Sequence, residues 1–300
     1  MPCFNIGRQR GVALLMAMLV VVIATVIAVS LVHEQSISVR KTAHILNTET
    51  ALMYNLGLED IARLFLQKDF KDSKTDHLGE DWTLGIALPV DGGFLSGTLE
   101  DAQARLNINN VLEKESADRL SALCNNLDIN PVFISAIKDW IDTDLDVIDA
   151  DGAEDDYYTG LEQPYRSANR MMTDISELML VKGIDSEIYN KIKPFITVLP
   201  ANSNLNINTI PSQVYQTLDD NLDVEKFIAE RERDPFTSLE DYKNRMGHTL
   251  PVKGMSVNTE YFLASAQITL GTNTLFVQML IQRDTKGATR ILSRKLGEFS

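Results

Sequence analysis

Residues 11–32 read GVALLMAMLVVVIATVIAVSLV, and this stretch decides how the rest of the chain is arranged. The twenty-one residues from 12 to 32 carry no formal charge. At about 1.5 Å per residue they form a helix of roughly 31 Å, which is enough to cross the hydrocarbon core of a bilayer. The run is longer than the apolar core of a secretory signal peptide, and His33, Glu34 and Gln35 follow it in place of an Ala-x-Ala cleavage site. The sequence therefore predicts a transmembrane anchor.

The charges on either side of this span predict its orientation. Arg8 and Arg10 precede the span, and no comparable basic cluster follows it until Arg40 and Lys41. Cytoplasmic flanks carry an excess of Lys and Arg, so the N-terminus is expected in the cytoplasm. Residues 33–300 would then lie outside the inner membrane.

The overall charge narrows the choice of partners. The 300 residues carry a net charge of −14, which disfavours nucleic acid as a partner because phosphate binding needs concentrated Lys and Arg. The length allows one large domain or two modest ones. Only two cysteines are present, Cys3 and Cys124, so cysteine usage does not settle the compartment.

Beyond the span, the helical pattern continues over 33–68. One apolar stripe recurs at steps of three and four residues and is expected to pack on the protein's own globular part; it consists of Ala51, Tyr54, Leu58, Ile61 and Phe65. Residues 69–81 are polar and are expected to form a loop.

Strand patterns occur in two groups that are separated by a helical block. The expected strands are 82–88, 94–99, 260–270, 274–283 and 288–296, with Asp91-Gly92-Gly93 as the first turn. The expected helices are 113–125, 131–141, 174–181, 186–195, 211–219, 223–232 and 238–246. This order predicts an α+β fold in which an all-α region interrupts an antiparallel sheet. Within that region, Leu-Asn-Ile-Asn occurs at 106–109 and again at 205–208, an echo too short to indicate a duplicated domain.

The strongest chemical signal is the acidic segment 139–156, in which nine of eighteen residues are Asp or Glu and none is basic. Carboxylates without nearby His or Cys favour calcium over zinc or copper. The segment begins like an EF-hand loop, but Val147 and Ala153 stand where that motif needs Gly and Glu. A solvated acidic loop without a metal is the alternative interpretation.

The start of the chain resembles a known class of proteins. Arg10-Gly11 before an apolar helix resembles the leader of type IV pilins and type II secretion pseudopilins, which is cut after the Gly. The resemblance implies that Gly11 ends the leader and that Val12 becomes the first mature residue. Most pilins carry Glu at the fifth mature position, where this chain has Met16. The K minor pseudopilins of type II secretion share this departure.

Further motifs support the resemblance to the K minor pseudopilin family. They follow the family's order and spacing and are Asp-Trp-Ile-Asp at 139–142, Gly-Ala-Glu-Asp at 152–155, Tyr-Tyr at 157–158, Pro-Tyr at 164–165, Ala-Asn-Arg at 168–170 and Ser-Glu-Leu at 176–178. The resemblance implies a pilin-like α+β fold, in which a long N-terminal helix packs on an antiparallel sheet that carries a large inserted all-α domain. The implied domains are a leader at 1–11, a transmembrane helix at 12–32, a spine helix with the first strands at 33–109, an inserted α-domain at 110–255 and closing strands at 256–300.

The resemblance also implies a function. Members of this family bind calcium in the α-domain, and the residues here that would serve as ligands are Asp142, Asp144, Asp151, Glu154 and Asp155. The protein would be a non-enzymatic subunit, anchored in the inner membrane and periplasmic in its bulk. It would sit at the tip of the pseudopilus and initiate or cap its assembly for export of folded proteins. The implied partners are the I and J minor pseudopilins, the major pseudopilin and prepilin peptidase.

A rival interpretation is a membrane-anchored DNA-binding protein of the competence type. Residues 176–184 resemble one helix-hairpin-helix unit, and residues 205–241 resemble another. However, the first hairpin has a single glycine, Gly183, and the second is acidic at 219–223, which would repel phosphate. Enzyme motifs for acyl or phosphoryl transfer are absent from the sequence, and His33, His44, His77 and His248 are scattered.

Overall fold

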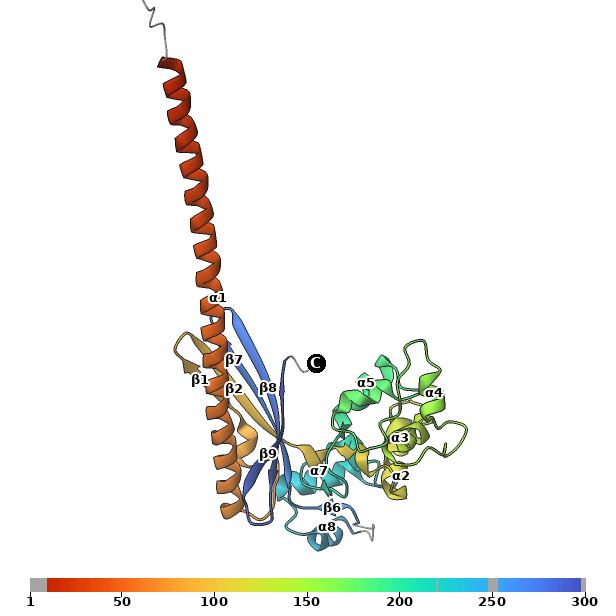
Figure 1. Ribbon diagram of the computed structural model, residues 1–300. Coiled ribbons are helices and arrows are strands. Elements are labelled where there is room, and N and C mark those ends of the chain that lie inside the picture. Colours follow the sequence, from red (N-terminus) through yellow and green to blue (C-terminus); the bar gives the residue numbers. More distant parts are fainter. Residues whose placement is uncertain (1–9, 220, 248–252, 298–300) are drawn as a thin grey trace, which may run out of the picture.

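The computed structural model describes residues 10–219, 221–247 and 253–297. It shows a long helix, α1 (Arg10–Asp72), packed on an antiparallel sheet, with a helical region beside the sheet (Figure 1). The predicted α+β class is confirmed. Most of the predicted leader lies outside the described residues, as does His248.

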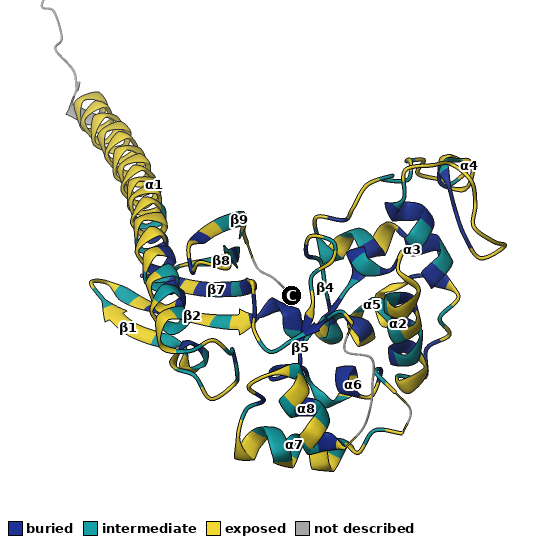
Figure 2. Cartoon of the chain, turned by 90° about the horizontal axis from the view of Figure 1, so that it is seen from below, coloured by how far each residue is buried: buried dark blue, intermediate teal, exposed yellow. Residues whose placement is uncertain are grey.

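Helix α1 is continuous over 63 residues and ends four residues beyond the predicted limit of 68. Its N-terminal half is apolar and exposed, and Figure 2 shows it projecting away from the rest of the chain. By length and composition this half is able to cross a membrane. Since its apolar side chains are exposed and meet no other part of the described chain, they are free to meet lipid or other helices.

The sheet has five strands in the order β1-β2-β7-β8-β9, and every neighbouring pair is antiparallel. The strands are β1 (Ile86–Val90), β2 (Gly93–Asp101), β7 (Tyr261–Leu270), β8 (Asn273–Arg283) and β9 (Thr289–Leu296). Strands β2 and β7 are neighbours although the whole helical region lies between them in sequence. Their register pairs Asp101 with Phe262 at the end where the chain leaves and re-enters the sheet.

The face that α1 buries on the sheet differs partly from the predicted stripe. The buried positions of this face are Ala51, Asn55, Leu58, Glu59, Ala62 and Leu66. Only Ala51 and Leu58 belong to the predicted set, whereas Phe65 is 37% exposed. The buried face is thus shifted around the helix from the predicted stripe, and it combines two alanines, two leucines and two polar side chains. The carboxylate of Glu59 accepts two hydrogen bonds from the Arg294 guanidinium, at 2.9 and 2.8 Å, which joins α1 to the edge strand β9.

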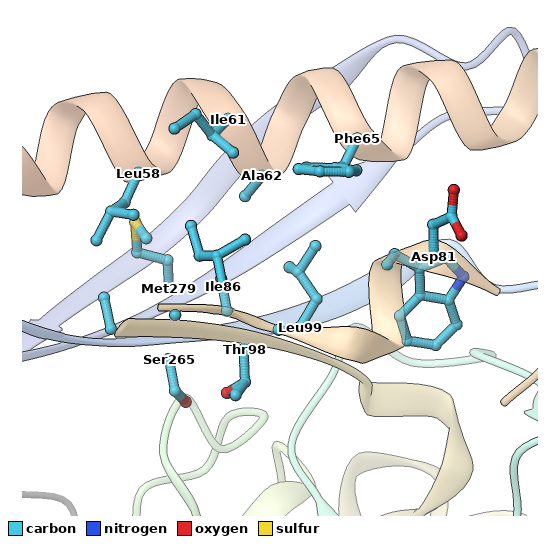
Figure 3. A pocket seen from close by; sticks show the side chains of 15 residues that line it. Leu58, Ile61, Ala62, Phe65, Asp81, Ile86, Thr98, Leu99, Ser265 and Met279 are labelled. Carbon is cyan, nitrogen blue, oxygen red and sulfur yellow. The ribbon is translucent and has the colours of Figure 1, made fainter. Parts of the chain in front are cut away.

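A small apolar cavity of about 50 Å³ lies between α1 and the first strands. Figure 3 shows Leu58 and Phe65 of α1 above Ile86 of β1, while Thr98 and Ser265 point to the opposite face of the sheet. Side chains of a strand point alternately to the two faces of the sheet, so only one of the two sets faces α1.

The predicted strand at 82–88 is wrong in its first half. Asp81–Leu84 forms a 3-10 turn, because Trp82 turns inward and packs edge-on against Phe262 with ring centroids 5.4 Å apart. Gly85, at a φ of 68°, then redirects the chain into β1. The turn between β1 and β2 consists of residues 91–92, since Gly93 already belongs to β2.

The helical region contains short helices that share one hydrophobic core. They are α2 (Lys114–Asn126), α3 (Phe133–Ile141), α4 (Asp155–Thr159), α5 (Ser186–Ile192), α6 (Ser212–Tyr215), α7 (Val224–Arg233) and α8 (Leu239–Met246). The predicted helix at 174–181 is a 3-10 helix, Ile175–Leu180, and the predicted helix at 211–219 shrinks to α6. Helix α4 is an addition within the acidic segment.

The Leu-Asn-Ile-Asn echo marks two equivalent structural units. The first occurrence forms β3 (Leu106–Asn107), which pairs in parallel with β4 (Ile196–Thr197). The second forms β5 (Leu205–Asn206), which pairs in parallel with β6 (Met255–Ser256). Each unit therefore begins and ends at a two-residue parallel ladder, a similarity that the short echo does not reveal by itself.

The last Asn of each echo plays the same part. Asn109 accepts a hydrogen bond from the backbone N–H of Met172 at 2.8 Å and donates to the carbonyl of Met172 at 3.0 Å. Asn208 does the same with Phe236, at 2.9 and 3.0 Å. Each Asn side chain thus pairs with both the backbone N–H and the carbonyl of one residue, as a neighbouring β-strand would.

Candidate metal centre

The acidic segment begins on the last turn of α3, where Asp139 is completely buried. One of its carboxylate oxygens accepts from the backbone N–H of Ile148 at 3.2 Å, and the other accepts from Ala153 at 2.7 Å. A Cβ on Gly152 would lie 2.2 Å from this carboxylate, so the close approach requires glycine. Asp139 therefore folds the acidic loop back onto α3 and is itself saturated.

Further contacts close the loop around this point. Asp149 accepts from the Ser135 hydroxyl at 2.7 Å and from the backbone N–H groups of Asp151 and Gly152 at 2.9 and 3.1 Å. The Lys182 ammonium donates to the carbonyl of Gly152 at 2.9 Å. Trp140 packs beneath the loop, edge-on to Tyr158 at 5.2 Å between ring centroids.

This folding brings Asp142, Asp144 and Glu154 together. One carboxylate oxygen from each lies within 4.8 Å of the others. Oxygens about 4.8 Å apart can share a cation to which each is bound at the 2.3–2.6 Å typical of calcium. Three of the five predicted ligands therefore converge.

Three oxygens at this place are buried and without a hydrogen-bond partner: Oδ1 of Asp142, Oε1 of Glu154 and Oδ1 of Asn169. An unsatisfied buried carboxylate oxygen is costly, and a cation satisfies several at once. The Asn169 backbone has a φ of 45°, in the left-handed region, and its amide donates to the carbonyl of Asp144 at 3.4 Å. The oxygen donors and the orphaned atoms fit a hard cation such as calcium.

The electrostatics of the group agree with this fit. Burial, followed by the nearby charges of Asp144 and Asp139, raises the pKa of Asp142. Burial also raises the pKa of Glu154, against the hydrogen bond from the Ser167 hydroxyl. These raised pKa values indicate negative charge that the surrounding protein does not compensate.

The other two predicted ligands lie elsewhere in the loop. Asp151 is exposed and is not part of the converging group. Asp155 accepts from the backbone N–H and the hydroxyl of Ser167, each at 3.0 Å, so it positions the segment that carries Asn169. Sequence reasoning noted Asn169 within Ala-Asn-Arg but not as a ligand. A polar amide next to a family motif was the available signal.

The predicted processing and membrane positions lie at the start of α1. Gly11 belongs to the first turn of the helix, and Val12 and Met16 are 59% and 63% exposed. The helix provides no partner for either side chain, as expected for a segment that is covered by lipid or by other subunits.

The two hairpins give no support to the DNA-binding interpretation. Gly183 has a φ of 85°, and a Cβ there would lie 3.3 Å from Phe133, so packing accounts for this glycine. In the second hairpin, the Asp219 carboxylate accepts the backbone N–H of Asn221 at 2.8 Å. A carboxylate thus takes the place that a phosphate would need.

Comparison with known proteins agrees with these features. The family described as type II secretion system (T2SS), protein K, matches residues 104–201. Type II secretion system protein K of Pseudomonas aeruginosa is 30% identical, over 97% of this chain and 93% of that protein. The protein K of Pectobacterium carotovorum is 29% identical, over 98% of each chain.

A solved structure shows the same fold. A chain in the crystal structure of the GspK–GspI–GspJ complex from the enterotoxigenic Escherichia coli type 2 secretion system superposes with a TM-score of 0.73 and 25% identity. The match covers 86% of this chain and 100% of that one. With its spine helix, antiparallel sheet and inserted helical region, the chain belongs to the type II secretion system protein K family and is a minor pseudopilin of that system.

Proposed function

We propose that the protein is the tip subunit of the pseudopilus, where it initiates or caps assembly for the export of folded proteins across the outer membrane. One observation carries this proposal: the helical region lies across the sheet from α1, level with the C-terminal half of that helix and away from its apolar half (Figure 1). A further subunit stacked on the C-terminal end of α1 would meet this region. The proposed role is structural rather than enzymatic.

The apolar half of α1 would join the helical bundle of neighbouring subunits. Its exposed side chains, such as Leu15 at 68% and Leu19 at 56%, offer an all-round apolar surface for that contact. The similar chain was solved together with GspI and GspJ, which supports the I and J minor pseudopilins as partners. The major pseudopilin would follow them below the tip.

We expect prepilin peptidase to cut after Gly11 and to expose Val12, which is then N-methylated. The first test is the intact mass and N-terminal sequence of the protein from membranes of cells with and without that peptidase. A mature chain that begins at Val12 only when the peptidase is present supports the proposal. The same proposal places the N-terminus in the cytoplasm and the bulk of the chain in the periplasm. A chain still beginning at Met1 in both strains would overturn it.

Deletion of residues 110–255 tests the tip role. The variant should insert into the membrane normally, because α1 is unchanged, but it should no longer be found at pseudopilus tips. Cross-linking to the I and J partners and immunogold labelling of pili provide the measurements. Recovery of the variant at normal tips would count against capping by the helical region.

Calcium is the proposed ligand of the acidic loop. Asp142, Asp144, Glu154 and Asn169 would hold it, and the ion would neutralise the converging carboxylates and order the loop. Calcium should raise the melting temperature of the purified protein relative to a chelator control. Glu154→Gln and Asn169→Ala should reduce that rise, and Asp151→Asn, an exposed carboxylate in the same loop, should leave it unchanged. Equal effects of all three substitutions would exclude this ligand set.

A further inference from the structure

A second group of carboxylates lies where α1 ends. Asp69 belongs to the last turn of α1, and Asp76 and Glu80 belong to the loop that follows. One carboxylate oxygen of each lies within 4.8 Å of the others. The side chains of Asp76 and Glu80 are buried, with exposed fractions of 2% and 9%, and that of Asp69 is partly buried at 13%. Figure 1 shows the end of α1 and the acidic loop on opposite sides of the sheet, so the two groups are separate.

Arg283, the last residue of β8, supplies positive charge to this group. One terminal nitrogen donates to Asp69 at 2.8 Å and to the carbonyl of Leu66 at 3.3 Å. The other donates to Asp76 and, at 3.1 Å, to the carbonyl of Thr259. Both terminal nitrogens are therefore engaged with Asp69, Asp76 and the backbone, and one guanidinium faces three carboxylates.

Glu80 is the member that Arg283 leaves uncompensated. Its Oε2 accepts from the Trp82 indole at 2.8 Å and from the backbone N–H of His77 at 2.9 Å. Its Oε1 is buried and has no hydrogen-bond partner. The Nε2 atom of His77 lies 3.7 Å away, which is too far for a hydrogen bond. A side chain more than nine-tenths buried thus contributes a carboxylate oxygen without a hydrogen-bond partner to a group of three carboxylates.

The surroundings confirm the excess of negative charge. Burial, followed by the charge of Glu80, raises the pKa of Asp69 to about 7 despite the hydrogen bond from Arg283. Nδ1 of His77 already accepts the N–H of Gly79 at 3.1 Å, so this nitrogen is not a free metal ligand. The available donors are therefore carboxylate oxygens, which favour a hard cation over zinc or copper.

We propose that Asp69, Asp76 and Glu80 bind a divalent cation of the calcium class, with Oε1 of Glu80 as its principal free ligand. The ion would tie the end of α1 to the loop at 76–80. Since Asp76 also accepts the backbone N–H of Thr259 at 2.7 Å, the same ion would hold the entry of β7 against α1. The site is independent of the acidic loop and of the proposed tip role.

The two tryptophans of the chain allow each site to be observed by itself. Trp82 donates to Glu80, whereas Trp140 packs beneath the acidic loop. In a Trp140→Phe variant of the full-length protein in detergent, terbium emission excited through tryptophan can come only from Trp82. Terbium replaces calcium at oxygen sites, so we expect sensitised emission that added calcium competes away.

Further substitutions in the Trp140→Phe variant test which carboxylate binds the ion. Glu80→Gln keeps the size of the side chain and should abolish the emission, while Asp72→Asn, an exposed carboxylate in the same turn of α1, should preserve it. Equilibrium dialysis of calcium should show one ion fewer for Glu80→Gln than for the otherwise wild-type protein. Emission that is absent from Trp140→Phe, or unchanged by Glu80→Gln, would overturn the proposal. A loss of emission after Glu154→Gln instead would assign the ion to the acidic loop.

Discussion

The Thr209 hydroxyl donates a 2.6 Å hydrogen bond to Oδ2 of Asp101, and this contact joins the second helical unit to the sheet. Asp101 is the last residue of β2, and Thr209 follows β5. The same carboxylate oxygen accepts from the Asn206 amide at 2.9 Å and from the Thr259 hydroxyl. The buried carboxylate of Asp101 therefore links the end of β2 to the second Leu-Asn-Ile-Asn segment and to the residues just before β7.

Asp101 should make stability depend on pH. Burial raises its pKa from 3.8 to about 6, so the folded protein holds this proton more tightly than the unfolded chain does. The resulting stabilisation is complete below about pH 4 and is lost as the pH rises through about 6. Between pH 7 and 4, the free energy of unfolding of the wild type should gain up to about 3 kcal/mol relative to Asp101→Asn. Denaturant titrations at several pH values measure this gap, and a constant gap would contradict the prediction.

The two equivalent asparagines should contribute similarly to stability. Asn109→Ala and Asn208→Ala each leave a buried N–H and carbonyl without a partner, at Met172 and Phe236 respectively. Each substitution should lower the free energy of unfolding by about 1–3 kcal/mol or more. Asn125→Ala, at an exposed position on α2, serves as the control and should change stability little. If only one of the two variants loses stability, the units are not equivalent in energy.

Two neighbouring glycines at the first hairpin, Gly92 and Gly93, should differ sharply in the stability lost when each is replaced by Ala. A Cβ on Gly93 would lie 1.7 Å from the carbonyl oxygen of Thr269 on β7, and backbone cannot move away cheaply. Gly93→Ala should therefore cost about 3 kcal/mol or more in unfolding free energy. Gly92 has a φ of 80° with open space around it, so Gly92→Ala should cost only about 1 kcal/mol. Thermal unfolding of both variants tests the order, and equal losses would show that β2 and β7 can separate.

Met16→Glu should leave the tip role nearly intact. Pairing at this position serves only a subunit that has another above it, so the added carboxylate should change none of the contacts that the tip role uses. The general cost of a carboxylate in lipid applies equally to the control below. Secretion by a strain that carries only the Met16→Glu protein should remain near the wild-type level. Met18→Glu, two positions further along α1, controls for placing a charge at this depth. Complete loss of secretion with Met16→Glu alone would argue against the tip position.

The sequence was sufficient for the long helix and for four of the five strands of the sheet. The length of the apolar run and the alternation of apolar and polar residues can be read without knowledge of the tertiary contacts. The sequence was insufficient for the two carboxylate groups, because each is formed by segments that are separated in sequence. The Asn169 amide reaches the carbonyl of Asp144 from a segment that Asp155 anchors through Ser167. The carboxylates of Asp69 and Glu80 meet only because the chain reverses after α1. The polar residues 69–81 predict a loop, but their composition does not show that Asp76 and Glu80 are buried.

The register of Asp101 with Phe262 has a consequence for how the helical region is attached to the sheet. The chain leaves β2 and returns to β7 at adjacent positions, so residues 102–260 are, in topology, the loop of one β-hairpin. A tight turn in its place would still close the five-stranded sheet against α1. The inserted helical region is therefore connected through the chain to the sheet at one place only, the end of the β2–β7 pair, and the strand pairing of the sheet does not depend on how long that connection is.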